Sequence, residues 1–340
     1  MPKKQNESCD FSSELKQLKS NGPERLYFLF GPEDYLSTYF LETLRSICLP
    51  EGDDGFSLKR FEGPDLNLLS LESALNSMPF LSERILIELH NIDINKLSDP
   101  DAWIGLLEDI PAFCTVVFIQ DFIYEPDGRL KLIKFLKSKG HALFFEAQDT
   151  AALVAWIRKR FAAYGKKIDG NTCEHLMFVS GTFMNRLIPE IDKIAGVVKG
   201  VTVTSEDIDD VVSKIPEADV FEMINALSSR NVDRAVGILS DLLFDKKTEP
   251  IAVVALIGMQ IRRLYGVKLA MTNGLGYNGV AEILHTTWGK IINECITAAK
   301  GFSLEKLADS VRKCAEADYC MKSSAFDNTD LLKELLLSFV

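Results

Sequence analysis

The sequence LYFLFGPEDYLST, residues Leu26–Thr38, decides the fold of the first part of the chain. Leu26–Phe30 is a continuous apolar run with the length of a buried strand, and it stops at Gly31-Pro32, a pair typical of a turn. Apolar residues with a helical period follow from Tyr35 to Ile47. A strand that passes through a glycine turn into a helix is a building block of α/β folds.

The segments that follow continue this alternation of strand and helix. Further strands are predicted at Phe56–Phe61, Ile85–Leu89, Thr115–Ile119 and Leu143–Phe145. Helical periods occupy the intervals, at residues 66–75, 103–107 and 130–136. Strands joined by crossover helices run parallel, so the sequence predicts an α/β module whose parallel sheet has five strands.

After Glu146 the pattern becomes almost entirely helical. Thr204 and Asp207 have the spacing of a helix N-terminus, and Val201–Val203 gives a weak strand signal just before them. Pro216 marks a linker, and a second helical group runs from there to the end of the chain. We therefore predict three domains: the α/β module at residues 1–147, a small helical lid at 148–215 and a helical collar at 216–340.

Composition bounds the class of protein. The hydrophobic content of 47% and charged content of 26% are those of an ordinary globular chain. No apolar segment follows Met1–Asp10 as in a signal peptide, and the apolar run Ile251–Met259 is shorter than the ~20 residues of a membrane span. Seven cysteines stand singly without a CxxC pair, which is typical of a reducing compartment. We expect a cytoplasmic protein with no membrane contact.

The charge favours a protein partner over nucleic acid as the main ligand. The formal net charge is −11, so the whole surface cannot follow a phosphate backbone. Residues 251–340 hold ten Lys or Arg and nine Asp or Glu, so the acidic excess lies earlier in the chain. Basic stretches at Arg129–Lys139 and Arg158–Lys167 are compatible with supporting DNA contacts or with ordinary solvated helix faces.

The turn after the first strand occupies the place of a phosphate-binding loop, GxxxxGK[ST]. In that register Gly31 and Thr38 match the motif, but Leu36 replaces its second glycine and Ser37 replaces its lysine. These changes remove the close backbone approach and the positive charge that the β- and γ-phosphates require. The turn is predicted to be a degenerate, non-functional phosphate loop. Taken alone, Gly31 also suits a strand end that never bound phosphate.

The chain from Phe11 onward resembles the delta subunits of bacterial DNA polymerase III clamp loaders, which have the AAA+ fold. The resemblance is carried by the order and spacing of several segments. They include LYFLFGPEDYL (26–36), FSLKRFEG (56–63), LNSMPFLSERILIELHN (75–91), LVAWIRKRFAAYGKKID (153–169), GTFMNRLIPEIDKIA (181–195), ADVFEMINAL (218–227) and PIAVVALIGMQIRRL (250–264).

The resemblance implies an AAA+-like module without a working nucleotide site, followed by a lid and a collar. It also implies the partners: the beta sliding clamp, the tau/gamma and delta prime subunits of the loader, and primed DNA through the assembled complex. Arg186 stands near the position of a nucleotide-sensing arginine in active relatives. Two alternatives remain open, a structural delta prime-like subunit and an active AAA+ ATPase.

In that family the clamp is contacted by a hydrophobic pair at the tip of the helix before the third strand. Met78, Pro79, Phe80 and Leu81 occupy this position here, although some relatives carry a larger aliphatic residue at Pro79. A buried aromatic anchor of this kind can dominate an interface, and a preceding proline restricts the backbone before docking. Packing of Met78 or Leu81 onto the sheet of the same module is the alternative.

No other motif indicates chemistry. The four histidines have no spacing suited to a metal or a catalytic triad, and the helical cysteines suit small apolar positions. We expect no catalytic residue, metal or cofactor in this chain, which would act as a subunit of a polymerase assembly.

Overall fold

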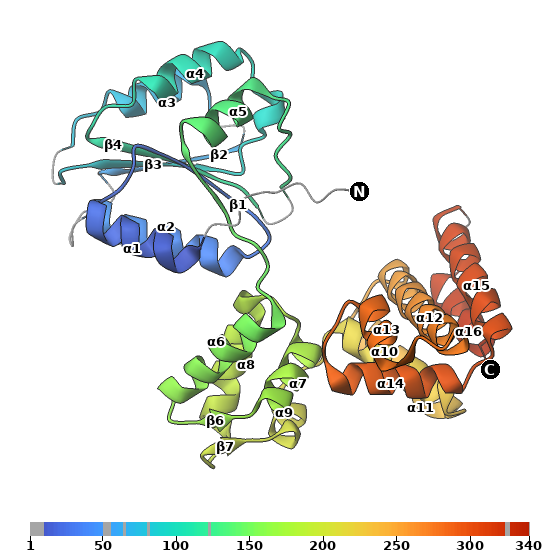
Figure 1. The fold of residues 1–340 in the computed structure, drawn as a ribbon. Helices are drawn as coiled ribbons and strands as arrows, with labels where there is room; N and C mark the ends of the chain where they lie inside the picture. The colour runs from blue at the N-terminus through green and yellow to red at the C-terminus, as the bar shows by residue number, and fades with distance from the viewer. Residues whose placement is uncertain are drawn as a thin grey trace. The chain divides into compact units, whose positions relative to one another are not determined.

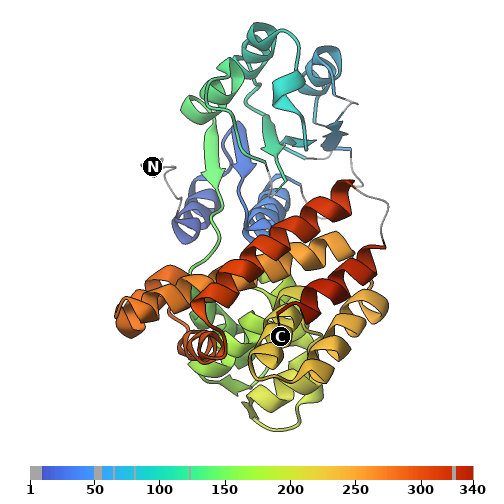
Figure 2. The same ribbon diagram turned by 90° about the vertical axis from the view of Figure 1, so that its right-hand side faces the viewer.

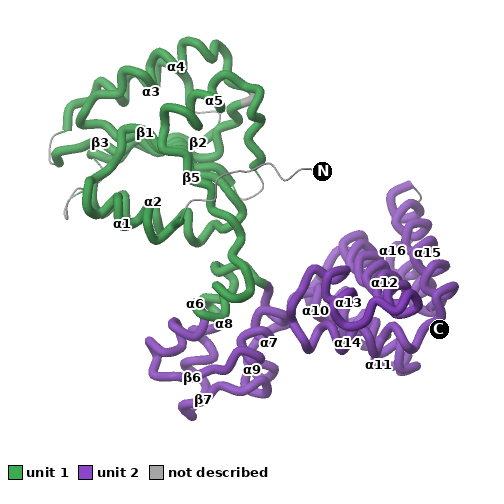
Figure 3. The backbone as a smooth tube through the Cα atoms, viewed as in Figure 1, with its two compact units in different colours: residues 1–156, 182–189 green, residues 157–181, 190–340 purple. Residues whose placement is uncertain are grey.

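The computed structural model describes residues 10–49, 56–63, 66–79, 82–121, 124–323 and 327–339. The chain divides into two compact units, residues 1–156 with 182–189 and residues 157–181 with 190–340 (Figure 3). The limits at 156/157 and 189/190 fall inside helix α6 (Thr150–Ala163) and helix α8 (Met184–Val197). The boundaries of the three domains expected from the sequence differ from the limits of the units and stay a prediction.

The centre of unit 1 is a five-stranded parallel sheet in the order β2-β3-β4-β1-β5 (Figure 1). Its strands are β1 (Leu26–Phe30), β2 (Leu58–Glu62), β3 (Ile85–His90), β4 (Cys114–Ile119) and β5 (His141–Phe144). The predicted parallel sheet is confirmed. The predicted start of the second strand is wrong, because pairing with β3 begins at Leu58 and leaves Phe56 outside β2.

Helices cover both faces of this sheet (Figures 1 and 2). One face carries α1 (Phe11–Asn21) and α2 (Asp34–Cys48), and the other carries α3 (Leu68–Leu75), α4 (Pro100–Glu108) and α5 (Lys131–Ser138). Alternate residues of β1 face opposite ways: Phe28 joins the core beneath α3–α5, whereas the Tyr27 ring lies 5.6 Å from that of Phe40 on α2. Burial on both faces explains why β1, β3 and β4 are nearly continuous apolar runs.

Helix α1 is not predicted from the sequence. Its N-terminus is capped by Asp10, whose side chain accepts a hydrogen bond from the N–H of Ser12. Leu18 is its buried residue, and the Phe11 ring lies 6.2 Å from that of Phe145. A helix held by so few apolar positions shows no clear apolar stripe in the sequence.

Helices α6, α7 (Gly170–Ser180), α8 and α9 (Ser205–Val211) follow the sheet. Thr204 and Asp207 form a reciprocal capping box at the start of α9, as predicted. Unit 2 also contains a two-stranded sheet of β6 (Lys167–Ile168) and β7 (Thr202–Val203). β7 confirms the weak strand signal, whereas β6 is too short to show alternation in the sequence.

The rest of unit 2 is helical. It consists of α10 (Pro216–Ser228), α11 (Val232–Ser240), the π-helical turn η3 (Asp241–Asp245), α12 (Pro250–Thr272), α13 (Gly276–Leu284), α14 (Gly289–Lys300), α15 (Leu304–Ser323) and α16 (Asn328–Leu337). The predicted fold class, an α/β module followed by helical regions, is confirmed.

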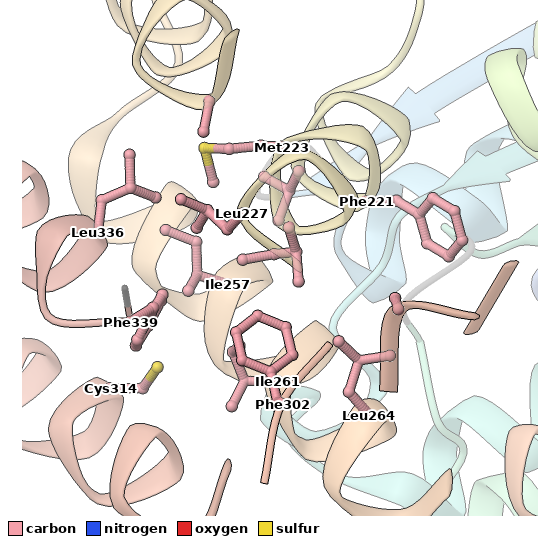
Figure 4. Close-up of a cluster of buried hydrophobic side chains, with 14 of the residues drawn as sticks. Phe221, Met223, Leu227, Ile257, Ile261, Leu264, Phe302, Cys314, Leu336 and Phe339 are labelled. Carbon is pink, nitrogen blue, oxygen red and sulfur yellow. The ribbon is translucent and has the colours of Figure 1, made fainter. Parts of the chain in front are cut away.

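Helix α12 is the centre of this helical region. It contacts α10, α13, α14, α15 and α16, and Figure 2 shows α15 running alongside it. Figure 4 shows Ile257, Ile261 and Leu264 of α12 within one apolar cluster that also contains Phe302 and Phe339. Among the described residues, α12 is long and apolar enough to cross a membrane, but its fully buried side chains are typical of a core helix.

Leu264 and Leu269, two of the leucines on α12, test this arrangement as a matched pair. Leu264→Ala should destabilise unit 2 by about 2–5 kcal/mol, because its fully buried side chain leaves a cavity. Leu269→Ala should cost less than about 0.5 kcal/mol, since Leu269 is 40% exposed. Urea denaturation followed by circular dichroism measures both, and equal losses in the two variants would contradict the central position of α12.

Candidate functional site

The turn after β1 is closed by contacts within the chain. Gly31 has φ +129°, and a Cβ at this position would lie 2.4 Å from the carbonyl oxygen of Phe145. The backbone N–H of Glu33 donates to the same carbonyl at 3.1 Å. This amide is therefore engaged with the segment after β5 and is not free to meet a phosphate.

The other residues of this turn belong to helix α2. The side chains of Leu36 and Ser37 are buried, whereas Thr38 is exposed to solvent. Leu36 thus occupies packed space where the phosphate-loop motif has a glycine, and the buried Ser37 supplies no positive charge. The degenerate loop stays a prediction, but its geometry offers little to a nucleotide phosphate.

The carboxyl group of Glu33 lies just before the start of α2. Its side chain is 1% exposed, and neither oxygen makes a close, well-aligned hydrogen bond. Burial raises the pKa of Glu33, and the backbone N–H groups of Met184 and Tyr35 oppose this effect only in part. An anion placed here would meet packed side chains and an acidic group whose charged form burial already disfavours.

Arg186 lies in the first turn of α8, and its side chain is exposed. Arg186 therefore lies on the helix that begins at Met184. The backbone N–H of Met184 lowers the pKa of the Glu33 carboxyl group. A nucleotide-sensing role for Arg186 stays untested.

Strand β3 carries a buried carboxylate that is contacted by three basic side chains. Both oxygens of Glu88 are held by Arg45 of α2, at 2.5 Å from Nε and 2.7 Å from Nη2. Arg60 Nε lies 3.3 Å from the same carboxylate, and His90 Nε2 lies 2.9 Å from it. Burial alone would raise the pKa of Glu88, but the contacts with His90 and Arg45 lower it to about 2. Glu88 therefore joins α2 to the sheet. In P-loop ATPases a carboxylate helps to hold the Mg²⁺ ion of the nucleotide, whereas the carboxylate of Glu88 is engaged by side chains of its own chain.

The apolar element predicted to contact a partner lies between α3 and β3. The side chain of Met78 is 78% exposed, and that of Pro79 is partly buried. Phe80 and Leu81 lie outside the described residues. The exposure of Met78 argues against its packing onto the sheet of unit 1.

Both ends of this loop are held to the sheet. At its start, the Cys114 thiol of β4 contacts the carbonyl oxygen of Leu75 at 3.6 Å. At its end, the Ser82 hydroxyl lies 2.6 Å from the Ser57 hydroxyl and 2.5 Å from the carbonyl oxygen of Arg84. Because its ends are fixed, less conformational entropy is lost when the loop meets a partner.

The loop between α3 and β3 and the turn at Gly31 lie at opposite edges of the sheet. The strands are parallel, and the turn at Gly31 follows the carboxyl end of β1. The loop precedes the amino end of β3 at Ile85. The candidate partner element is therefore separated from the degenerate phosphate turn by the length of the strands.

Sequence reasoning misses two parts of this edge. Phe56 is interpreted as a strand residue, yet its side chain is 64% exposed. The Ser57–Ser82 contact joins residues distant in sequence, and no local pattern reveals it. Among the described residues no group of three His, Cys, Asp or Glu side chains is arranged to hold a metal.

Comparisons with known proteins point to one family. Residues 217–339 match the family model described as the DNA polymerase III delta subunit, C-terminal domain. The whole chain is similar to DNA polymerase III subunit delta of Bacillus subtilis, at 26% identity over 335 residues, covering 96% of this chain and 95% of the relative. The structure of a Bacillus subtilis DNA clamp loader delta protein shares the fold, with TM-score 0.56, 24% identity and coverage of 97% and 99% of the two chains.

The Glu88 cluster predicts a pH dependence of stability. The pKa of Glu88 is about 2 in the folded state, below its ordinary value of 4.5. The stabilisation that the charged carboxylate of Glu88 gives to the fold is therefore complete above about pH 5 and is lost as the pH falls toward 2. Glu88→Gln should therefore lower the free energy of unfolding by about 3 kcal/mol at pH 7. The difference from wild type should shrink progressively between pH 5 and pH 2.

Urea denaturation at pH 7, 5 and 3 measures this difference. Glu72→Gln, at an exposed position on α3, is the control and should show no such trend. A loss for Glu88→Gln that stays constant from pH 7 to pH 3 would contradict the assignment.

Proposed function

We propose that this chain, which resembles the DNA polymerase III delta subunit over nearly its whole length, binds the beta sliding clamp as a subunit of the bacterial replicative clamp loader. It opens the clamp ring for loading onto primed DNA and does not hydrolyse ATP itself. The observation that carries this proposal is the loop after α3, which exposes Met78 at the amino edge of the sheet between two fixed ends. A solvent-exposed apolar side chain on an anchored loop suits insertion into an apolar pocket of a partner.

The loop can do mechanical work by differential affinity alone. A ring opens when a bound protein has higher affinity for the open form than for the closed form. The contact between the loop and the clamp needs no nucleotide bound to this chain. This agrees with the turn at Gly31, where the backbone N–H of Glu33 already donates to the carbonyl oxygen of Phe145. ATP bound to other subunits would then control when the loop reaches the clamp.

The helical region that matches the delta C-terminal family supports assembly with the other loader subunits, tau/gamma and delta prime. Residues 251–340 carry nearly balanced charge, unlike the acidic remainder of the chain. A surface with nearly balanced charge causes little electrostatic repulsion when helices of two subunits pack together. Primed DNA would meet this chain within the assembled complex, in the cytoplasm.

A delta prime-like structural subunit is the alternative within the same assembly. Such a subunit would need no exposed apolar loop, so the exposure of Met78 favours the clamp-binding assignment. An active AAA+ ATPase is disfavoured by Leu36 and Ser37 in the phosphate turn and by the occupied carboxylate of Glu88.

We expect the isolated chain to hydrolyse ATP no faster than background, because Leu36 and Ser37 replace the glycine and lysine of the phosphate loop. A phosphate-release assay on the purified chain measures this. Thr38→Ala is the control, and turnover that this substitution abolishes would restore the ATPase alternative.

Phe80→Ala should weaken clamp binding at least ~30-fold, about 2 kcal/mol, while leaving the melting temperature unchanged. Met78→Ala should weaken binding in the same direction, because its side chain is already exposed in the free chain. Surface plasmon resonance against the purified clamp and thermal denaturation of the same preparation give both readouts. Wild-type affinity in a well-folded Phe80→Ala protein would remove the clamp-binding assignment.

A further inference from the structure

Phe56 is an exposed aromatic residue whose position the fold of unit 1 does not explain. Its side chain is 64% exposed, whereas the next residue, Ser57, is 1% exposed. Strand β2 begins at Leu58, so Phe56 lies just before the amino end of that strand. An exposed phenylalanine gains little from hydrophobic burial within its own chain, and exposed apolar side chains that gather in one patch mark interaction sites.

Hydrogen bonds place Ser57, the residue after Phe56, beside the loop that follows α3. The carbonyl oxygen of Ser57 accepts from the N–H of Leu86 at 2.8 Å, which fixes its backbone against β3. The two hydroxyl oxygens of Ser57 and Ser82 are 2.6 Å apart, and the Ser82 hydroxyl donates to the carbonyl of Arg84 at 2.5 Å.

This pairing brings two exposed apolar side chains to one edge of the sheet. β2 and β3 are parallel neighbours, so their amino ends lie together, with Phe56 before one and the Met78 loop before the other. Met78 is 78% exposed and Phe56 is 64% exposed. A central pair of apolar anchors, set by buried polar contacts behind them, is a common design of protein interfaces.

We propose that Phe56 is a second apolar anchor of the clamp-binding surface, held beside the Met78 loop by the Ser57–Ser82 hydrogen bond. The inference rests on the proposed function, because its occupant is the same sliding clamp that receives the loop. The continuity of Phe56 with the loop, through Ser57 and Ser82, supports one partner for both. Ser57 acts as a positioning residue, since its buried hydroxyl reaches the loop and not the partner.

The experiment measures clamp affinity for single and double variants of the full chain. Phe56→Ala should weaken binding about tenfold with an unchanged melting temperature, because an exposed side chain contributes little to the core. Phe244→Ala is the matched control: this phenylalanine is 65% exposed in η3 of unit 2, and its loss should leave clamp affinity unchanged.

A double variant tests whether the two anchors act together. Phe56→Ala with Met78→Ala should weaken binding by a factor different from the product of the single effects, since neighbouring anchors in one interface are coupled. Ser57→Ala should weaken binding less than Phe56→Ala, while Ser57→Thr, which keeps the hydroxyl, should recover part of the loss.

The outcomes separate this inference from the proposal on which it rests. Weaker binding by Met78→Ala or Phe80→Ala, with wild-type affinity in Phe56→Ala, would overturn the second anchor and leave the clamp-binding function standing. Equal losses in Phe56→Ala and Phe244→Ala would also overturn it. Absence of clamp binding by the wild-type chain would overturn both.

Discussion

The common direction of the five strands is the constraint on which the arrangement of unit 1 depends. Because they are parallel, the turns that follow strands gather at one edge and the loops that precede strands gather at the other. The turn at Gly31 lies at the first edge, and the loop at Met78 lies at the second. The turn that follows β1 is therefore separated from the loop before β3 by the length of the strands.

The turn at Gly31 shows that a residue matching a motif can be required by packing alone. Gly31 is required by packing, since any Cβ would collide with the backbone of Phe145 whether or not a phosphate is bound. Leu36 and Ser37 are under no such steric demand for glycine or lysine, and α2 simply buries them. A glycine retained at a strand end is thus weak support for nucleotide binding, whereas the residue at the lysine position is strong support.

The sequence predicts what depends on local pattern and misses what depends on distant contacts. β1 and the Thr204–Asp207 cap are visible because an apolar run and a capping pair are local signals. Helix α1 is missed because its few apolar contacts form only against the folded sheet. The exposure of Phe56 is missed because an aromatic residue before a strand suits the strand equally well, and only pairing with β3 decides where β2 begins.

The burial of α12 has a consequence for the newly made chain. This helix is apolar enough to resemble a membrane segment, and one of its main partners, α15, begins at Leu304, well after α12 ends at Thr272. At a synthesis rate of about 5–20 residues per second, the apolar face of α12 waits seconds for that partner to emerge from the ribosome. During this interval α10, which is already made, can cover only part of the apolar surface that α12 buries in the folded chain.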